Sequence, residues 1–179
     1  MPLKITIPGV EYYDEKNESF ITTEPTVLTL EHSLVSVAKW ESKWHKPFLE
    51  EKPPKTDEEL LDYIRCMTIT QNVDPEIYKR IPLDVIGQIN AYIEDPMTAT
   101  TFKKKPSGHP SVITSEVIYY QMIALGVPFE CQRWHLTRLL TLLRVCNEKA
   151  NPKKMSKRDI LSQNSALNKA RRAALKTRG

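Results

Sequence analysis

The chain has only five glycines in 179 residues, and they do not build a phosphate-binding loop. Such a loop brings backbone amides against a nucleotide phosphate and needs several glycines at fixed, close spacings. Acid pairs such as Glu58 and Glu59 lie at the expected start of a helix, where the helix dipole stabilises them without any catalytic role. No pattern of catalytic groups is recognisable. We therefore expect a protein that is not an enzyme and uses no cofactor.

Long apolar runs are also missing. The longest, around residues 117–125, is far shorter than the roughly 20 residues that a membrane-spanning helix requires. The N-terminus carries no basic segment followed by an apolar one, which is the pattern of a secretion signal. These absences predict a cytoplasmic protein that does not bind membranes.

The cysteines Cys66, Cys131 and Cys146 are odd in number and far apart, and no Cys-x-x-Cys occurs. Cys131 and His135 would share one helix face and could supply two ligands to zinc, but a structural zinc site needs four and no second close pair exists. Catalysis by Cys131 would also need an orienting group and an electropositive pocket. We predict free, buried thiols and no metal. The alternative pattern is an apolar helix stripe: Leu136, Leu139, Leu140, Leu143 and Cys146.

Helical periodicity dominates the middle of the chain. Thr56 and Glu59 form a capping box, in which each side chain bonds the other residue's backbone amide. Asp74 and Pro75 have the pattern of a helix cap and a first helical residue. The predicted helices begin near residues 34, 57, 75, 83 and 115. A further helix is predicted over 129–146.

Apolar residues at helical spacing give the expected buried faces of these helices. The predicted stripes are Leu60, Leu61, Ile64 and Met67 in one helix, and Val85, Ile86, Ile89 and Ile93 in another. The segment 115–125 is apolar on nearly all sides, and a helix of that kind is usually buried. We therefore expect it at the centre of the domain.

The first 30 residues have a different pattern. "LKITIPG" alternates apolar and polar residues, "SFITTEPTVLTLEH" partly repeats the alternation, and "DEKNES" between them has turn composition. These patterns predict a small hairpin or three-stranded meander, which is too little sheet to be stable alone. The predicted fold is mainly α with a small N-terminal β element (α+β). Its parts are a β segment 1–30 packed on a helical, bundle-like core 31–150, and a basic helix or tail 151–179.

Charge is distributed unevenly along the chain. Residues 152–179 contain nine Lys or Arg against the single acid Asp159, a net charge of +8, which leaves −4 on the first 151 residues because the total is +4. Ser156 and Asp159 have the pattern of a helix start. The loop 100–111, which contains Lys103–Lys105, is predicted to be mobile. The basic tail indicates a partner that is negatively charged.

Three interpretations of the tail are open. It is frayed, because its apolar stripe is thin; it is a helix that docks on an acidic groove of another protein; or it binds nucleic acid. The absence of aromatic residues for base stacking argues against nucleic acid. The candidate partner-binding residues of the tail are Lys169, Arg171, Arg172, Lys176 and Arg178.

Trp40 and Trp44 in "KWESKWHKPF" lie four residues apart and share one face of a predicted helix. They either pack in the core, which is the favoured interpretation, or form an exposed aromatic patch for a partner helix. We retain both as partner-binding candidates.

Several long stretches carry a resemblance to a known family. They are "LTLEHSLVSVAKWESKWHKPFL", "DYIRCMTITQNV", "MTATTF", "ITSEVIYYQMIALGVPFECQRWHLTRLLTLLRVCN" and "KKMSKRDILSQNSALNKARRAALKTRG". Together they cover nearly the whole chain from Leu28 onwards. The sequence resembles a family of small proteins of tailed bacteriophages and prophages that are described as tail assembly chaperones.

The resemblance implies a non-enzymatic protein of virion morphogenesis in the bacterial host cytoplasm. Its partner would be the long, helical tape-measure protein, which it would keep soluble until the tail tube polymerises, with the tail tube protein as a further candidate partner. Families of this name often have a longer, frameshifted product that shares the N-terminal part. Such a partner calls for shallow apolar grooves and complementary charge.

Two other functions compete with the chaperone. A virion structural or head-tail connector protein would assemble into a ring as a homo-oligomer and stay in the particle. A packaging factor would bind nucleic acid through the basic tail and Lys103–Lys105, with a steep dependence of affinity on salt.

Overall fold

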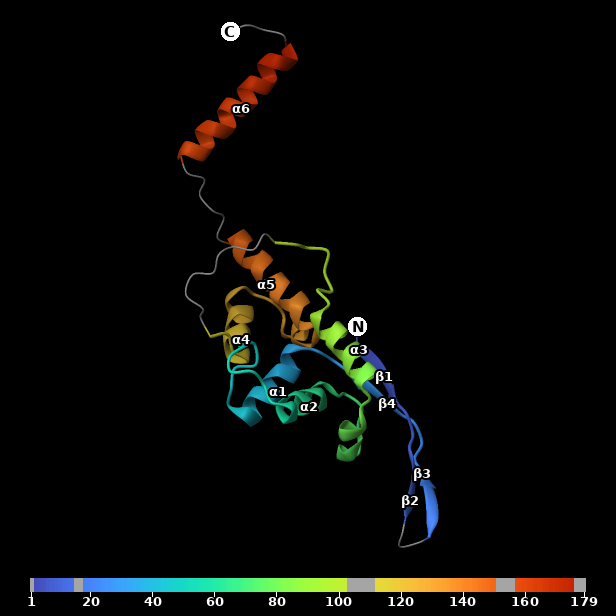
Figure 1. Ribbon diagram of the computed structural model, residues 1–179. Helices are drawn as coiled ribbons and strands as arrows, with labels where there is room; N and C mark the ends of the chain where they lie inside the picture. Colours follow the sequence, from blue (N-terminus) through green and yellow to red (C-terminus); the bar gives the residue numbers. More distant parts are fainter. Residues whose placement is uncertain (1, 15–17, 103–111, 151–156, 176–179) are drawn as a thin grey trace. The chain divides into compact units, whose positions relative to one another are not determined.

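The computed structural model describes residues 2–14, 18–102, 112–150 and 157–175. Within them the chain forms two compact units, Met1–Val145 and Cys146–Gly179. Figure 1 shows that the first unit combines a two-stranded β ribbon with helices, while the second contains a long helix. The predicted mainly α fold with a small N-terminal β element is confirmed.

The strands pair as nested hairpins. β1 (Leu3–Ile7) pairs antiparallel with β4 (Thr26–Leu30), and β2 (Glu11–Asp14) pairs antiparallel with β3 (Ser19–Thr22). Because β1 pairs with the last strand of the segment and not with the next one, the three-stranded meander is wrong. In the β1–β4 ladder, one face of the ribbon is buried: Ile5, Ile7, Leu28 and Leu30.

Gly9 is required where the two ladders meet. A Cβ atom at this position would lie 1.9 Å from the carbonyl oxygen of Thr23, which is closer than any side chain can be placed. The backbone N–H of Val10 donates to Thr23 Oγ1 at 2.9 Å, and the N–H of Thr23 donates to the Val10 carbonyl at 2.9 Å. The two ladders are therefore joined by a close backbone approach that only glycine permits.

Beyond this junction, the apolar side chains of the ribbon that the structure describes are exposed. Tyr13 and Phe20 are cross-strand partners in the β2–β3 ladder, and both are exposed. Their ring centroids lie 5.1 Å apart, within the range of a favourable aromatic pair. The aromatic pair therefore stabilises β2–β3 locally.

The helices of the first unit are short and have well-formed ends. They are α1 (Leu34–Trp44), α2 (Asp57–Met67), the 3₁₀ helix η1 (Pro75–Arg80), α3 (Leu83–Glu94), α4 (Ser115–Ala124), the 3₁₀ helix η2 (Phe129–Arg133) and α5 (Leu136–Ala150). The predicted capping box is confirmed: Glu59 N–H donates to Thr56 Oγ1 at 3.2 Å, and Thr56 N–H donates to Glu59 Oε2 at 2.8 Å. The Asp74 carboxylate caps η1 by accepting from Glu76 N–H.

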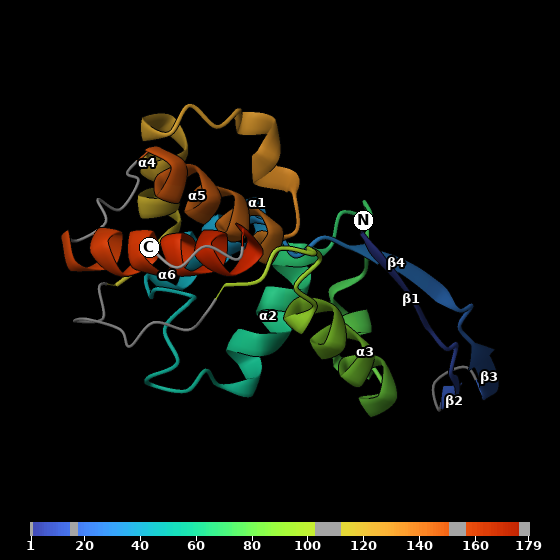
Figure 2. The ribbon, with the colours of Figure 1, turned by 90° about the horizontal axis from the view of Figure 1, so that it is seen from above.

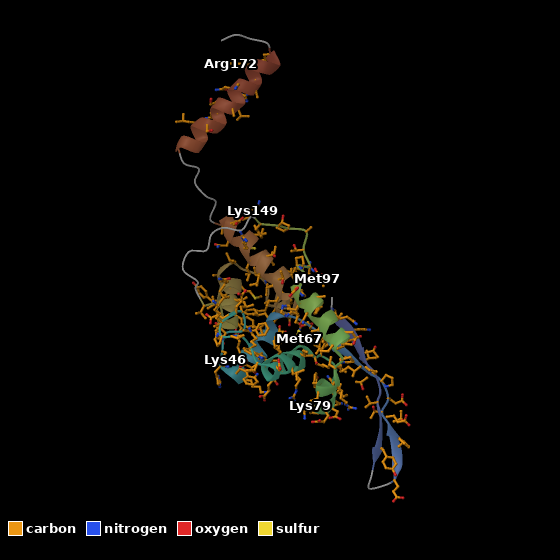
Figure 3. The ribbon with its side chains drawn as sticks, viewed as in Figure 1. Lys46, Met67, Lys79, Met97, Lys149 and Arg172 are labelled. Atoms are coloured by element: carbon orange, nitrogen blue, oxygen red, sulfur yellow. The ribbon has the colours of Figure 1, made fainter. Side chains whose placement is uncertain are left out.

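The core of this unit forms where α1 contacts α2 and α4, and where α3 contacts β1 of the β1–β4 ladder. Trp40 is 1% exposed, and its indole N–H donates to the Glu59 carbonyl at 2.8 Å. Met67, labelled in Figure 3, is fully buried at the end of α2. A tryptophan that is buried with its N–H satisfied contributes apolar area without an unpaired donor. The other fully buried large side chains include Leu28, Leu30, Leu34, Val37, Ile89, Ile118, Met122, Leu136 and Leu139.

The predicted continuous helix over 129–146 is wrong. η2 ends at Arg133, and His135 lies in an isolated antiparallel bridge with Ser33 before α5 begins. The Leu136 N–H donates to the His32 carbonyl at 2.9 Å. This hydrogen bond between distant segments interrupts the helix that the local periodicity of residues 129–146 predicts.

A buried network of rings holds this junction. His32 Nδ1 and the Tyr63 hydroxyl are 2.6 Å apart, and the Nε2–H of His135 donates to the Tyr92 carbonyl at 2.9 Å. The His32 and His135 ring centroids are 4.9 Å apart. Burial, together with the nearby His135, lowers the pKa of His32 from 6.5 to about 3. Both rings are thus neutral in the folded protein near pH 7, because burial lowers the pKa of His135 as well.

The predicted central position of residues 115–125 is also wrong. In α4 only Ser115, Ile118 and Met122 are buried, while Val117, Tyr120 and Ile123 are exposed. In the described part of the chain, the opposite face of this apolar helix is not covered.

The second unit contains α6 (Lys157–Leu175), so the described part of the predicted basic helix or tail is a helix. Ser156, its predicted cap, lies outside the described residues, as do Lys103–Lys105. Leu161, Leu167 and Leu175 are exposed on α6. None of the described helices combines the length and the apolar character that a membrane crossing requires.

Candidate partner-binding surfaces

An apolar groove lies between α2 and α3, which are side by side in Figure 2. Its volume is about 370 Å³. It is lined on α2 by Asp57, Leu60, Leu61, Tyr63 and Ile64, and on α3 by Leu83, Ile86, Ile89, Asn90 and Ile93. Because only Asp57 and Asn90 in this set are not apolar or aromatic, the groove suits an apolar surface of a partner.

The exposure of the lining residues shows which of them form the floor of the groove and which form its edges. Tyr63, Ile64 and Ile89 are buried, whereas Leu60 is 48% and Leu83 is 86% exposed. The predicted buried stripe is therefore wrong at Leu60. Each of these leucines would gain up to about 2 kcal/mol from full burial, so a partner that covers them would be stabilised.

Acidic side chains are exposed on both helices of this groove, and one of them, Asp57, is part of its lining. Asp57 and Glu58 are exposed in the first turn of α2, and Asp84 and Glu94 are exposed at the two ends of α3. α3 contains no Lys or Arg. The one base of α2, Arg65, lies 3.9 Å from the carboxylate of Asp62. The rim of the groove is therefore negatively charged.

A second apolar surface lies on α4. Tyr120 is 69% and Ile123 is 64% exposed, and Val117 is exposed one turn earlier. Positions three apart on a helix are neighbours on its surface, so these side chains form one continuous face. Phe129 lies at the edge of this face. Its ring centroid is 6.2 Å from that of Tyr119, which is four residues before Ile123 on the same helix.

Exposed apolar side chains are concentrated in this region. Of the sixteen large apolar side chains that are exposed among the described residues, six lie between Val112 and Phe129. Exposed apolar residues that occur singly need no explanation, but a cluster of them is typical of an interaction site. We refer to Val117, Tyr120, Ile123 and Phe129 as the α4 face.

The two tryptophans predicted as partner-binding candidates belong to the core and its edge. Core packing is confirmed for Trp40, so the exposed aromatic patch is wrong at this residue. Trp44 is half-buried: its ring stacks on that of Trp40 with centroids 6.2 Å apart, and its N–H donates to Asp62 Oδ2 at 2.9 Å. Lys43 Nζ lies 2.5 Å from the other oxygen of Asp62. These contacts hold Trp44 against Trp40 and Asp62 and leave little of its surface free to contact a partner.

The basic candidates lie on α6, in the second unit. Lys169, Arg171 and Arg172 are exposed there, and Figure 3 labels Arg172 on this helix. Lys176 and Arg178 lie outside the described residues. The candidates from the tail and the two tryptophans therefore belong to different units and do not make one described site.

Cys131 and His135 do not share a helix face, because η2 ends between them. Cys66, Cys131 and Cys146 are free thiols, as predicted; Cys131 is buried and the other two are half-buried. In the described part of the chain, no group of three or more His, Cys, Asp or Glu side chains is placed to hold a metal ion.

The sequence carried partial signals for both apolar surfaces. The apolar character of 115–125 was evident, but periodicity alone does not tell whether such a helix is buried on both sides. Leu60 and Leu83 lie beside acidic residues, and an acidic neighbour is a sign of an exposed position. The apolar stripe is the stronger signal in the sequence, and it indicates a buried position. No protein-family model, no curated protein and no solved structure matches this chain.

Proposed function

We propose that the protein is a tail assembly chaperone of a tailed bacteriophage or prophage. In this function it binds the tape-measure protein in the bacterial cytoplasm during tail morphogenesis and keeps it soluble until the tail tube forms around it. The observation that supports the proposal best is the exposed apolar α4 face, together with the resemblance of the sequence to proteins described in this way.

The α4 face has the chemistry that such a function requires. A long helical client has apolar stripes that associate with one another until they are covered, and a helix pairs with another helix through apolar residues three and four positions apart. Val117, Tyr120 and Ile123 present these spacings to solvent. A side chain of this size gains about 1.5–3 kcal/mol when it passes from exposed to fully buried. A few such contacts give reversible binding, which suits a chaperone.

The test is co-expression with the long helical tail protein encoded nearby, followed by pull-down and mass spectrometry of the complex and of finished particles. We expect the client to be soluble and bound, and the chaperone to be absent from particles. The double variant Tyr120→Glu/Ile123→Glu should lose the client. Val27→Glu is the matched control, because Val27 is an exposed apolar residue on β4.

Two results would contradict the proposal. Presence in finished particles at a fixed copy number would identify a structural or connector protein instead. Client that stays soluble and bound to the Tyr120→Glu/Ile123→Glu variant, with its circular dichroism unchanged, would exclude the α4 face as the binding surface.

A further inference from the structure

We infer that the groove between α2 and α3 is a separate docking site for an amphipathic helix whose polar flanks carry Lys or Arg. It shares no residue with the α4 face. The inference therefore stands on the groove itself and does not depend on the proposed chaperone function.

The shape of the groove favours a helix as the occupant. Its walls are two helices, and the lining residues on each recur at three and four positions, such as Leu60 and Ile64 on α2 and Ile86 and Ile89 on α3. Rows with this spacing accept the side-chain rows of a third helix. From Leu83 to Ile93 the wall on α3 is about 15 Å long at 1.5 Å per residue, which matches a partner helix of about three turns.

The apolar contact would form on Leu60 and Leu83. These are the most exposed leucines of the lining, and the deeper Tyr63, Ile64 and Ile89 are already buried in the unit. An occupant with leucine-sized residues along one face would cover both leucines and leave the buried residues undisturbed. Helices bind to apolar grooves in this way in many complexes.

The negative charge of the rim determines which flanking charges a partner helix needs in order to bind. Asp57 lines the groove and Glu94 follows the lining residue Ile93, and both of these acids are exposed. The described side chains of α2 and α3 oppose them with Arg65 alone, which lies beside Asp62. A helix with acidic flanks would place like charges together, whereas Lys or Arg on both flanks would meet opposite charge. The groove therefore discriminates between partner helices by their flanking charge.

The experiment uses two synthetic peptides and the full-length protein. Both peptides are amphipathic helices of four turns with the same leucine stripe; one has Lys and the other Glu at every flanking position. Fluorescence anisotropy measures their affinities at low and at high salt. We expect the Lys peptide to bind at least roughly tenfold more tightly at low salt, and the difference to shrink as salt screens the rim.

Variants of the protein locate the binding. Leu60→Glu/Leu83→Glu should reduce the affinity for the Lys peptide by roughly tenfold or more, and Asp57→Asn/Glu94→Gln should reduce it by roughly threefold to tenfold. Val27→Glu on β4 is the control, because Val27 is an exposed apolar residue that lies outside both the groove and the α4 face. All variants change exposed residues, so thermal melting should confirm that each is folded.

Three outcomes would overturn the inference. Equal affinities for the Lys and Glu peptides would remove the selection by charge. An unchanged affinity in folded Leu60→Glu/Leu83→Glu would place the peptide elsewhere. Concentration-dependent self-association that Leu83→Glu abolishes would assign the groove to a second copy of this chain instead of a partner protein.

Discussion

α2 and α4 are neighbours of the same helix, α1, and are of similar length, yet they are stabilised differently. α2 begins with a complete capping box, buries Tyr63, Ile64 and Met67, and exposes Asp57 and Glu58 in its first turn. The cap residue of α4, Thr114, makes no side-chain cap bond, and the Ser115 N–H donates instead to Glu41 Oε2 of α1 at 2.7 Å. α4 also exposes apolar residues where α2 exposes acids. The difference teaches that apolar residues at helical spacing predict a surface that packs against another element. They do not predict whether that element belongs to the same chain or to a partner.

Substitutions on the two faces of α4 should give the largest difference in the free energy of unfolding. Ile118 is fully buried, so Ile118→Ala should lower the free energy of unfolding by about 2–5 kcal/mol through lost burial and a cavity. Ile123→Ala on the exposed face should change it by no more than about 0.5 kcal/mol. Urea unfolding measures both. Similar losses in the two variants would mean that the exposed face is covered in the free protein.

The attachment of α2 should depend on pH, because Tyr63 on this helix meets the buried His32. The pKa of His32 is about 3 in the folded protein and 6.5 ordinarily, so below about pH 6.5 the unfolded chain binds a proton that the folded chain does not. Stability should be constant above that pH and fall as pH decreases towards 3, by up to about 1.4 kcal/mol per pH unit.

Urea unfolding at several pH values measures this slope. His32→Gln should reduce it, whatever its effect on stability at pH 7. His45→Asn should leave the slope unchanged, since His45 is exposed and asparagine tolerates its positive φ of 53°. A slope that is the same in all three proteins would show that other groups cause the acid sensitivity.

The helix caps provide a smaller and more local comparison. Thr56→Ala removes the acceptor for Glu59 N–H and should cost about 1 kcal/mol. Thr114, at the same position before α4, makes no such cap bond, so Thr114→Ala should cost only a few tenths of that amount. Thermal melting of the pair at pH 7 tests the difference. Equal costs would show that threonine acts at both positions by backbone propensity alone.

α6 extends the comparison to a helix without a described buried residue. Deletion of residues 169–179 should leave the melting temperature of the protein within a few degrees, because Lys169, Arg171, Arg172 and Leu175 are exposed. If the tail docks on an acidic surface of the client, the same deletion should weaken client binding in the pull-down. A large decrease in melting temperature would instead make α6 part of the core.

Local features of the fold could be predicted well. The capping box of Thr56 and Glu59 spans three residues, and the Asp74–Pro75 start of η1 spans two, so the interactions that fix these ends are written in adjacent positions. The break before α5 could not be predicted. It depends on the bridge between Ser33 and His135, and the intrinsic preference of residues 129–146 gives no sign of that partner.

The candidate surfaces were less accessible from the sequence than the fold. Trp40 and Trp44 attract attention as aromatic residues, but the carbonyl of Glu59 and the carboxylate of Asp62 hold their N–H groups within the unit. Leu60 has the spacing of a buried residue and is nevertheless half exposed. In both cases a side chain of the right chemistry was recognised, and the neighbouring element decided whether it was available.

The sequence by itself determined the starts of α1, α2, η1, α3 and α4, the strand alternation and the separation of a basic tail from an acidic body, because these depend on neighbouring residues and on composition. Only the tertiary structure decided that β1 pairs with β4, that His32 meets His135, and that one side of α4 and the space between α2 and α3 are open to a partner. The physical reason is that burial is a property of pairs of elements. A periodic pattern specifies which face of a helix is apolar, but the packing of the other elements specifies whether that face is covered.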